Sequence, residues 1–184
     1  SQRLYPKLTT GLETKVQGRL AAADFDARIY LVNGRGPTSG EQDDNANKGL
    51  GGRVVFTGVG ERWRVGQSFY RDRNGDANGS LQTHGGADIS LSTRGFSAGP
   101  MAIGEINLTW IDPEIASSTV ARSRSGYLEL LWRTASGFTP WLRAERVDLN
   151  LDLGGSERSS YGAGLAYDLN ENVRVKADVM LSPA

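Results

Sequence analysis

Charged side chains that could bind or sort ions recur at every second position along much of this 184-residue chain. Near the C-terminal end, Arg174, Lys176 and Asp178 alternate with Val173, Val175, Ala177 and Val179. Successive side chains of a β-strand point to opposite faces, so this spacing predicts one charged face and one apolar face. Arginine, lysine and carboxylate groups that line a wet surface bias which ions and polar solutes pass over it.

The same alternation assigns eleven cationic and seven anionic positions to the polar face. They are Lys15, Arg19, Arg28, Arg53, Arg62, Arg64, Arg94, Arg133, Arg143, Arg174 and Lys176, against Glu13, Asp26, Asp88, Glu105, Glu129, Glu145 and Asp178. If this face lines a pore, the excess of cations predicts a mild preference for anions. The alternative is that opposite charges pair across neighbouring strands and stiffen the wall.

Two predicted loops carry several acidic residues that could bind metal ions. Asp72, Asn74, Asp76 and Asn78 have the alternate spacing that begins a calcium loop, but Ala77 and Thr83 stand where that pattern needs Gly and Glu. The sequence therefore favours an ordinary hydrated loop over a metal site here. Glu41, Asp43 and Asp44 form a second acidic segment, which is either solvated or bridged through divalent ions to lipopolysaccharide.

Catalysis is not expected. His84 is the only histidine, and neither a serine elbow nor paired acids accompany it and Asp88. No cysteine is present, which excludes disulfides and thiolate metal sites, and no cofactor is predicted. Equal numbers of Lys plus Arg and Asp plus Glu, 21 of each, indicate no nucleic-acid partner.

These side chains require strands to position them, and the pattern predicts ten strands and no helix. The strands are expected at residues 12–20, 25–32, 50–57, 62–69, 87–94, 102–110, 128–133, 141–151, 161–169 and 173–181. Residues 33–47, 72–85, 112–124 and 154–160 are expected to be long loops. In the strand at 141–151 the apolar parity changes after Ala144, which predicts a β-bulge near Arg146.

The connections alternate between short and long, as in outer-membrane barrels with short periplasmic turns and longer external loops. The predicted fold is therefore an all-β, antiparallel up-and-down transmembrane β-barrel, forming a single domain or barrel fragment over residues 1–184. The alternative is a secreted β-barrel or sandwich whose apolar parity forms its core. Trp63, Phe69, Trp110, Trp132 and Tyr161 fall near strand ends on the apolar parity and suit interfacial girdles, whereas Trp141 falls on the polar parity.

The direction of the strands predicts more of the barrel than this chain contains. With short turns in the periplasm, the first strand descends and the tenth ascends, so both ends of the chain would be external. An open ten-strand sheet would leave two unpaired edges in lipid. A larger barrel, of twelve to sixteen strands or more, is therefore expected.

Several segments resemble porins of Gram-negative outer membranes, and most of all the family of phosphate-selective porins. They are FDARIYLVNGRG (25–36), NKGLGGR (47–53), RVGQSFYRDR (64–73), FTPWLRAERVD (138–148) and YGAGLAYDLN (161–170). The resemblance implies the C-terminal portion of a diffusion pore of about sixteen strands, often a homotrimer. No residue matches that family's phosphate-gripping constriction loop, so phosphate selectivity is not implied.

The expected function is passive diffusion of small hydrophilic solutes or ions through an outer-membrane channel. Expected partners are outer-membrane lipid, lipopolysaccharide and the solutes, with a homotrimer or a larger envelope complex as the assembly. The first alternative is a non-conducting barrel that acts as a scaffold or sheath for a partner in an envelope complex. The second is a soluble ligand-binding β-barrel with its apolar residues turned inward.

Overall fold

The computed structural model describes residues 11–33, 48–73, 81–96, 98–112, 121–152, 156–169 and 173–182. Within these ranges the chain forms ten strands and one 3₁₀ helix, η1 (Val59–Glu61). The strands are β1 (Gly11–Leu20), β2 (Ala23–Asn33), β3 (Lys48–Gly58), β4 (Trp63–Arg73), β5 (Leu81–Ser92), β6 (Gly99–Asp112), β7 (Ala121–Arg133), β8 (Phe138–Asp148), β9 (Glu157–Asp168) and β10 (Arg174–Leu181).

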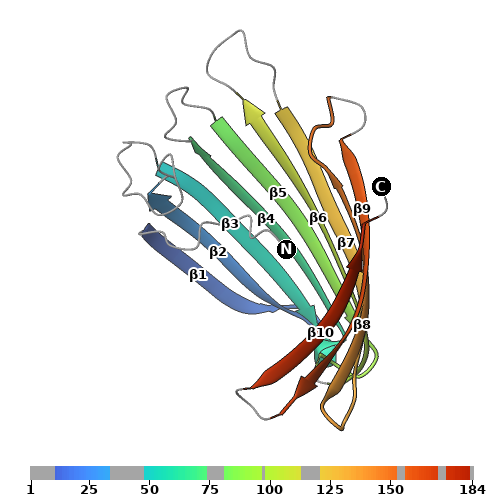
Figure 1. Cartoon of the computed structure of the whole chain (residues 1–184). Coiled ribbons are helices and arrows are strands. Elements are labelled where there is room, and N and C mark those ends of the chain that lie inside the picture. Colours follow the sequence, from blue (N-terminus) through green and yellow to red (C-terminus); the bar gives the residue numbers. More distant parts are fainter. Residues whose placement is uncertain are drawn as a thin grey trace.

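The ten strands form one sheet in sequence order, and each pairs antiparallel with the next along the chain. This confirms the predicted all-β, up-and-down fold. Figure 1 shows the sheet as a curved, open surface with β1 and β10 at its two edges. The predicted rhythm of connections is also confirmed, since β1–β2, β3–β4, β5–β6, β7–β8 and β9–β10 are joined by short segments at one end of the sheet.

Several strands extend into segments that the sequence assigns to long loops, and β4, β5, β7 and β9 do so by two residues or more. β4 continues to Arg73 and β5 begins at Leu81, so Asp72 and His84 are strand residues rather than loop residues. The side chain of Asp72 accepts a hydrogen bond from Tyr70 of the same strand, and His84 forms a hydrogen bond with Thr109 on the neighbouring strand β6. Each contact gives a hydrogen-bond partner to one polar atom of a side chain that composition alone would assign to solvent.

The predicted β-bulge near Arg146 is wrong. β8 keeps an unbroken register with both neighbours, from Leu131↔Trp141 to Arg124↔Asp148 on one side and from Phe138↔Tyr167 to Asp148↔Glu157 on the other. The strand ends at Asp148, so Leu149 and Leu151 lie in the connection that follows β8. Within the strand, Val147 falls on the polar parity and Arg146 on the apolar parity, where Arg146 pairs with Glu157.

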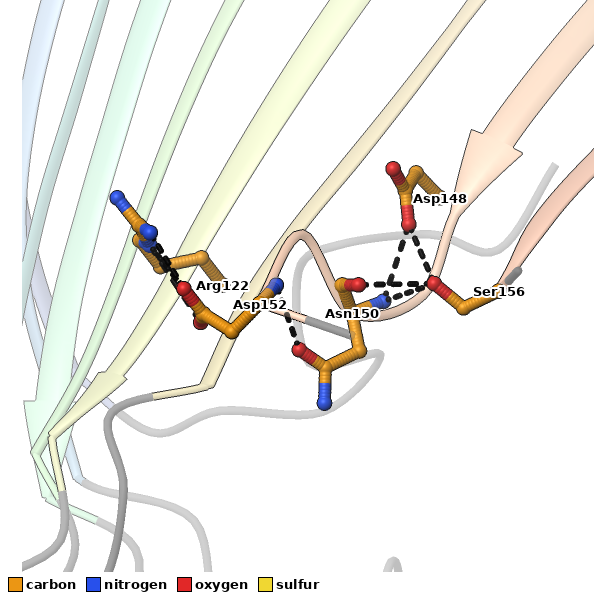
Figure 2. A network of polar contacts seen from close by, with 5 residues as sticks. All are labelled: Arg122, Asp148, Asn150, Asp152 and Ser156. Atoms are coloured by element: carbon orange, nitrogen blue, oxygen red, sulfur yellow. Dashed lines mark hydrogen bonds and ion pairs between the residues drawn. The ribbon is translucent and has the colours of Figure 1, made fainter. Parts of the chain in front are cut away.

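A polar network explains why β8 ends there (Figure 2). The hydroxyl of Ser156 donates to Asp148 at 2.6 Å and accepts from the backbone N–H of Asn150 at 3.1 Å. The Asn150 side chain in turn accepts from the backbone N–H of Asp152 at 3.0 Å, and Asp152 pairs with Arg122 of β7. Side chains that satisfy the backbone in this way compete with the strand ladder and fold the chain into a turn.

The two faces of the sheet differ in exposure as well as in composition. Large side chains of the apolar parity are exposed, for example Ile29 at 60%, Leu128 at 54% and Leu142 at 59%. On the polar parity the side chains of Asp88 and Arg143 are only 17% and 16% exposed. The polar parity of the central strand β4 is buried from Gly66 to Asp72, whereas Arg19 near the β1 edge is 73% exposed. Since side chains converge and cover one another on the concave side of a curved sheet, we infer that the polar face is the concave one.

Buried apolar residues are few in the described ranges: Val32, Tyr70, Met101 and Ala166. The described residues contain no helix of the length and apolarity needed to cross a bilayer.

Candidate functional site: the polar face of the sheet

Register brings like charges side by side on the polar face. Lys15 lies opposite Arg28, which lies opposite Arg53, and these three residues of β1, β2 and β3 form a cationic row. The neighbouring row, two residues earlier in β2 and nearer the short-turn end, contains Asp26, Asp88, Glu105 and Glu145 and forms an acidic row. Like charges directly opposite one another are destabilising, so each row needs a counter-charge.

Ion pairs between the two rows supply that counter-charge. Lys15 lies 3.2 Å from Asp26, Arg28 lies 2.8 Å from Asp26, and Arg53 lies 2.7 Å from Asp88. Two further pairs join residues directly opposite one another in the register: Arg19 lies 2.7 Å from Asp24, and Arg174 pairs with Asp168. These cations therefore form ion pairs with carboxylates of the same or nearby strands, as the alternative to a free pore lining predicts.

The pair between Arg53 and Asp88 spans two strand spacings, because β4 lies between β3 and β5. The β4 residue beneath it is Gly66, which lies opposite Val55 on β3 and Asp88 on β5. A Cβ atom at position 66 would lie 2.4 Å from a carboxylate oxygen of Asp88 and 2.8 Å from Nη2 of Arg53. The absence of a side chain at Gly66 therefore allows the two charges to meet above β4.

A second charge cluster centres on Arg143 of β8. Its guanidinium lies 3.2 Å from Glu145, 3.8 Å from Glu129 and 3.8 Å from the centre of the Tyr127 ring. Glu105, opposite Tyr127, accepts a hydrogen bond of 2.7 Å from Asn107. Three predicted carboxylates and Arg143 are thus brought together over β6, β7 and β8, with Tyr127 between them. The sequence prediction missed Tyr127, although it shares the parity of Glu129.

Other cations of the polar face have no ion pair within the described ranges, and three of them lie at the short-turn end. Arg64 of β4 stacks over the Phe96 ring at 4.9 Å, and Arg133 of β7 donates to the Phe96 carbonyl. Arg94 lies in the same β5–β6 turn as Phe96 and is exposed. This end of the polar face therefore carries an excess of positive charge.

The polar face is hollowed between β1 and β4. A cavity of about 640 Å³ is lined by Gln17, Asp24, Asp26, Arg28, Arg53 and Arg64, together with turn residues that include Glu61. Charges of both signs surround this space, so it suits water and small polar solutes better than apolar ones.

Tyrosine and histidine side chains form a separate buried cluster toward the long-loop end of the polar face. Tyr70 is 1% exposed, stacks with Tyr30 at 6.3 Å between ring centres, and donates a 2.8 Å hydrogen bond to Asp72. Nδ1 of His84 lies 3.0 Å from the Thr109 hydroxyl, and its ring centre lies 6.2 Å from that of Tyr70. The sequence prediction missed Tyr70. Its position between Phe69 and Arg71, which lie on the opposite parity, would have placed it on the polar face.

Some predicted site residues are not part of these clusters. Lys176 and Asp178 lie on β10, where every described residue is exposed, and neither has an ion pair within the described ranges. Arg62 lies outside the alternation that the sequence prediction assumed, and it lines a groove whose other lining residues are mostly of the apolar parity. The reason is its place in the turn before β4, where its backbone is α-helical rather than extended.

Of the four residues with calcium-loop spacing, the structure describes only Asp72. Asp72 is buried in β4 and accepts a hydrogen bond from Tyr70, whereas Asn74, Asp76 and Asn78 lie outside the described residues, as do Glu41, Asp43 and Asp44. Among the residues that the structure does describe, no three His, Asp or Glu side chains are grouped to hold a metal ion.

Aromatic side chains occupy both faces as parity predicts. Trp63, Phe69, Trp110, Trp132 and Tyr161 are all exposed on the apolar face. Trp141 lies on the polar face against Gly164 of β9, where a Cβ atom would come within 2.6 Å of the indole ring.

Comparison of the chain with known protein families, curated proteins and solved structures gives no match.

Proposed function

We propose that this chain forms part of the wall of a water-filled outer-membrane channel, through which small hydrophilic solutes and ions diffuse passively. One observation carries the proposal: the large apolar side chains are exposed on the convex face, while the charged side chains gather on the concave face. In water, an apolar surface of this extent is unfavourable. In a bilayer it would contact hydrocarbon, and the concave charged face would enclose water.

The height of the apolar band supports the same proposal. Trp132 lies opposite Pro100 near the short-turn end, and Trp110 lies ten residues further along β6. Ten residues of strand extend for about 33 Å. At a tilt of about 40° they rise about 25 Å, the height of the apolar band between the aromatic girdles of membrane barrels.

The charges support a mild preference for anions. The three cations Lys15, Arg28 and Arg53 contribute little net field, because three carboxylates lie beside them: Asp26 and Asp88 in the pairs described above, and Glu13 at 3.8 Å from Arg28. Arg64, Arg94 and Arg133 are not paired with a carboxylate in the described ranges, and they lie together at the short-turn mouth. A ring of cations at a pore entrance raises the local concentration of anions.

The direct test is cell fractionation followed by planar-bilayer recording of the purified chain. The proposal predicts recovery in the outer-membrane fraction, extraction only by detergent, and stepwise conductance. Recovery without detergent would contradict it and support the soluble barrel. Insertion without conductance would also contradict it, and would support the scaffold alternative.

Reversal potentials in a salt gradient test the anion preference. Arg64→Gln is expected to shift the reversal potential toward cation preference, because it removes an unpaired charge. The double variant Arg19→Gln/Asp24→Asn is the matched control, since it removes one charge of each sign and should leave the potential unchanged. A cation preference in the unmodified channel would contradict the assignment.

A further inference from the structure

The apolar face is not uniform, because a groove crosses it at the short-turn end. Trp63, Leu91, Ala102, Leu130, Leu142 and Ala163 lie side by side in register from β4 to β9. They line a groove of about 890 Å³ together with Trp132 and Pro100 of the adjacent row. The two alanines have short side chains between larger neighbours, which explains the depression. Its volume falls within the range of about 300–1,000 Å³ typical of small-ligand sites.

One positive charge borders this apolar groove. Arg62 lines it beside Trp63 and Ser92, and the backbone N–H of Ser92 donates to the Arg62 carbonyl at 2.7 Å. No residue that lines the groove is acidic, and Arg62 has no ion pair within the described ranges. Glu61, its neighbour in sequence, lines the hollow on the polar face instead. The groove thus combines a long apolar wall with a single cation.

We propose that this groove binds an anionic phospholipid, with an acyl chain along the Trp63–Ala163 row and the headgroup phosphate at Arg62. The inference rests on the proposed function, since it needs the apolar face to lie in a bilayer. The short-turn end would then lie at the headgroup level, where tryptophan and arginine are both favoured. Apolar contact alone would accept any lipid, whereas the arginine adds selectivity for a negative headgroup.

A second copy of this chain is the competing occupant, and the charges oppose it. In a two-fold contact the same patch meets itself. Arg62 would then enter an apolar groove that offers no carboxylate. An unpaired charge buried in that way is strongly unfavourable.

Fluorescence quenching by brominated lipids tests the proposal on the full chain. Trp63 and Trp132 are the reporters, and the changes Trp110→Phe and Trp141→Phe remove the other two of the four tryptophans. The variant would be reconstituted in phosphatidylcholine vesicles that contain a minor fraction of either brominated phosphatidylglycerol or brominated phosphatidylcholine. The expected result is an apparent affinity about fivefold higher for the anionic lipid, corresponding to about 1 kcal/mol for one arginine at an anionic surface.

Two changes should remove the preference and one should not. Arg62→Gln removes the cation, and Ala102→Phe fills the groove while Arg62 remains. Arg158→Gln is the matched control, because Arg158 is an exposed arginine at the long-loop end of β9. Equal quenching by the two lipids, or a preference that survives Arg62→Gln, would overturn this inference and leave the proposed function intact.

The remaining outcomes separate the two proposals. If neither lipid quenches the reporters, crosslinking shows whether protein or water covers the groove. The chain has no cysteine, so Ala102→Cys introduces a unique thiol. A disulfide-linked dimer in vesicles would overturn the lipid site in favour of a second copy. Absence of both quenching and dimer would overturn the membrane location itself.

Discussion

Replacement of Gly66 by alanine is expected to separate Arg53 from Asp88 and to weaken the channel wall. The new Cβ atom would lie 2.4 Å from Asp88 and 2.8 Å from Arg53. Ordinary contacts need about 3.5 Å. The backbone at this point is held by the ladder on both sides, so the side chains must move and the 2.7 Å pair is lost.

The expected cost follows from the exposure of the pair. A hydrogen bond to a charged group contributes about 1.5–3 kcal/mol when buried, and an exposed ion pair contributes about 0.2–1 kcal/mol. The side chains of Arg53 and Asp88 are 39% and 17% exposed, which places the pair between these limits. We therefore expect the ion pair to contribute about 1–2 kcal/mol. Alanine is better than glycine within a strand by about 0.5–1 kcal/mol, which offsets part of the loss.

Gly104→Ala is the matched control, because Gly104 is also an interior strand residue and a Cβ atom there would approach no atom closer than 3.5 Å. Urea unfolding in detergent, followed by tryptophan fluorescence, should show Gly66→Ala less stable than Gly104→Ala by about 1–2 kcal/mol. In an Asp88→Ala background the difference should disappear. Equal stabilities of the two alanine variants, or an unchanged difference in that background, would refute a pair that crosses above β4.

Two further predictions concern the wall and the turn after β8. Trp141→Ala should lower the free energy of unfolding by about 2 kcal/mol, because the indole packs on Gly164. This is less than for a fully buried tryptophan, since Trp141 is only half-buried. Trp132 is 57% exposed on the apolar face, so Trp132→Ala should cost less in the same unfolding assay. The hydrogen bond from Arg122 holds the pKa of Asp152 below its ordinary value. The pair therefore stabilises the turn above about pH 5 and loses that contribution as the pH falls through the lowered pKa, below the ordinary aspartate value of about 4. Hydrogen exchange of the Leu151 amide, which donates to the Arg122 carbonyl, should accelerate below that pH relative to its intrinsic rate, and an unchanged protection factor in Asp152→Asn would contradict this.

The strands and their two faces could be predicted because their signal is local. A period of two assigns Ile89 and Leu91 to one face and Asp88 to the other without knowledge of any partner strand. The exposed apolar residues and the shielded Asp88 agree with that assignment. The same local reasoning failed at Leu149 and Leu151, where apolar residues continue past the end of β8. There, side-chain hydrogen bonds by Asp148 and Asn150 end the strand, and alternation does not encode them.

Which charges meet depends instead on contacts between residues far apart in the chain. Alternation places Arg53 and Asp88 on one face, but their pairing requires the register of β3, β4 and β5 and a glycine at the crossing point. Register likewise sets Arg28 between Lys15 and Arg53, which makes the carboxylate of Asp26 necessary. The sequence pattern of one strand gives only the face on which each side chain lies, because side chains alternate between the two faces whichever strands are its neighbours. The partner of each charge is set by the neighbouring strands, since only they decide which atoms come within a few ångströms.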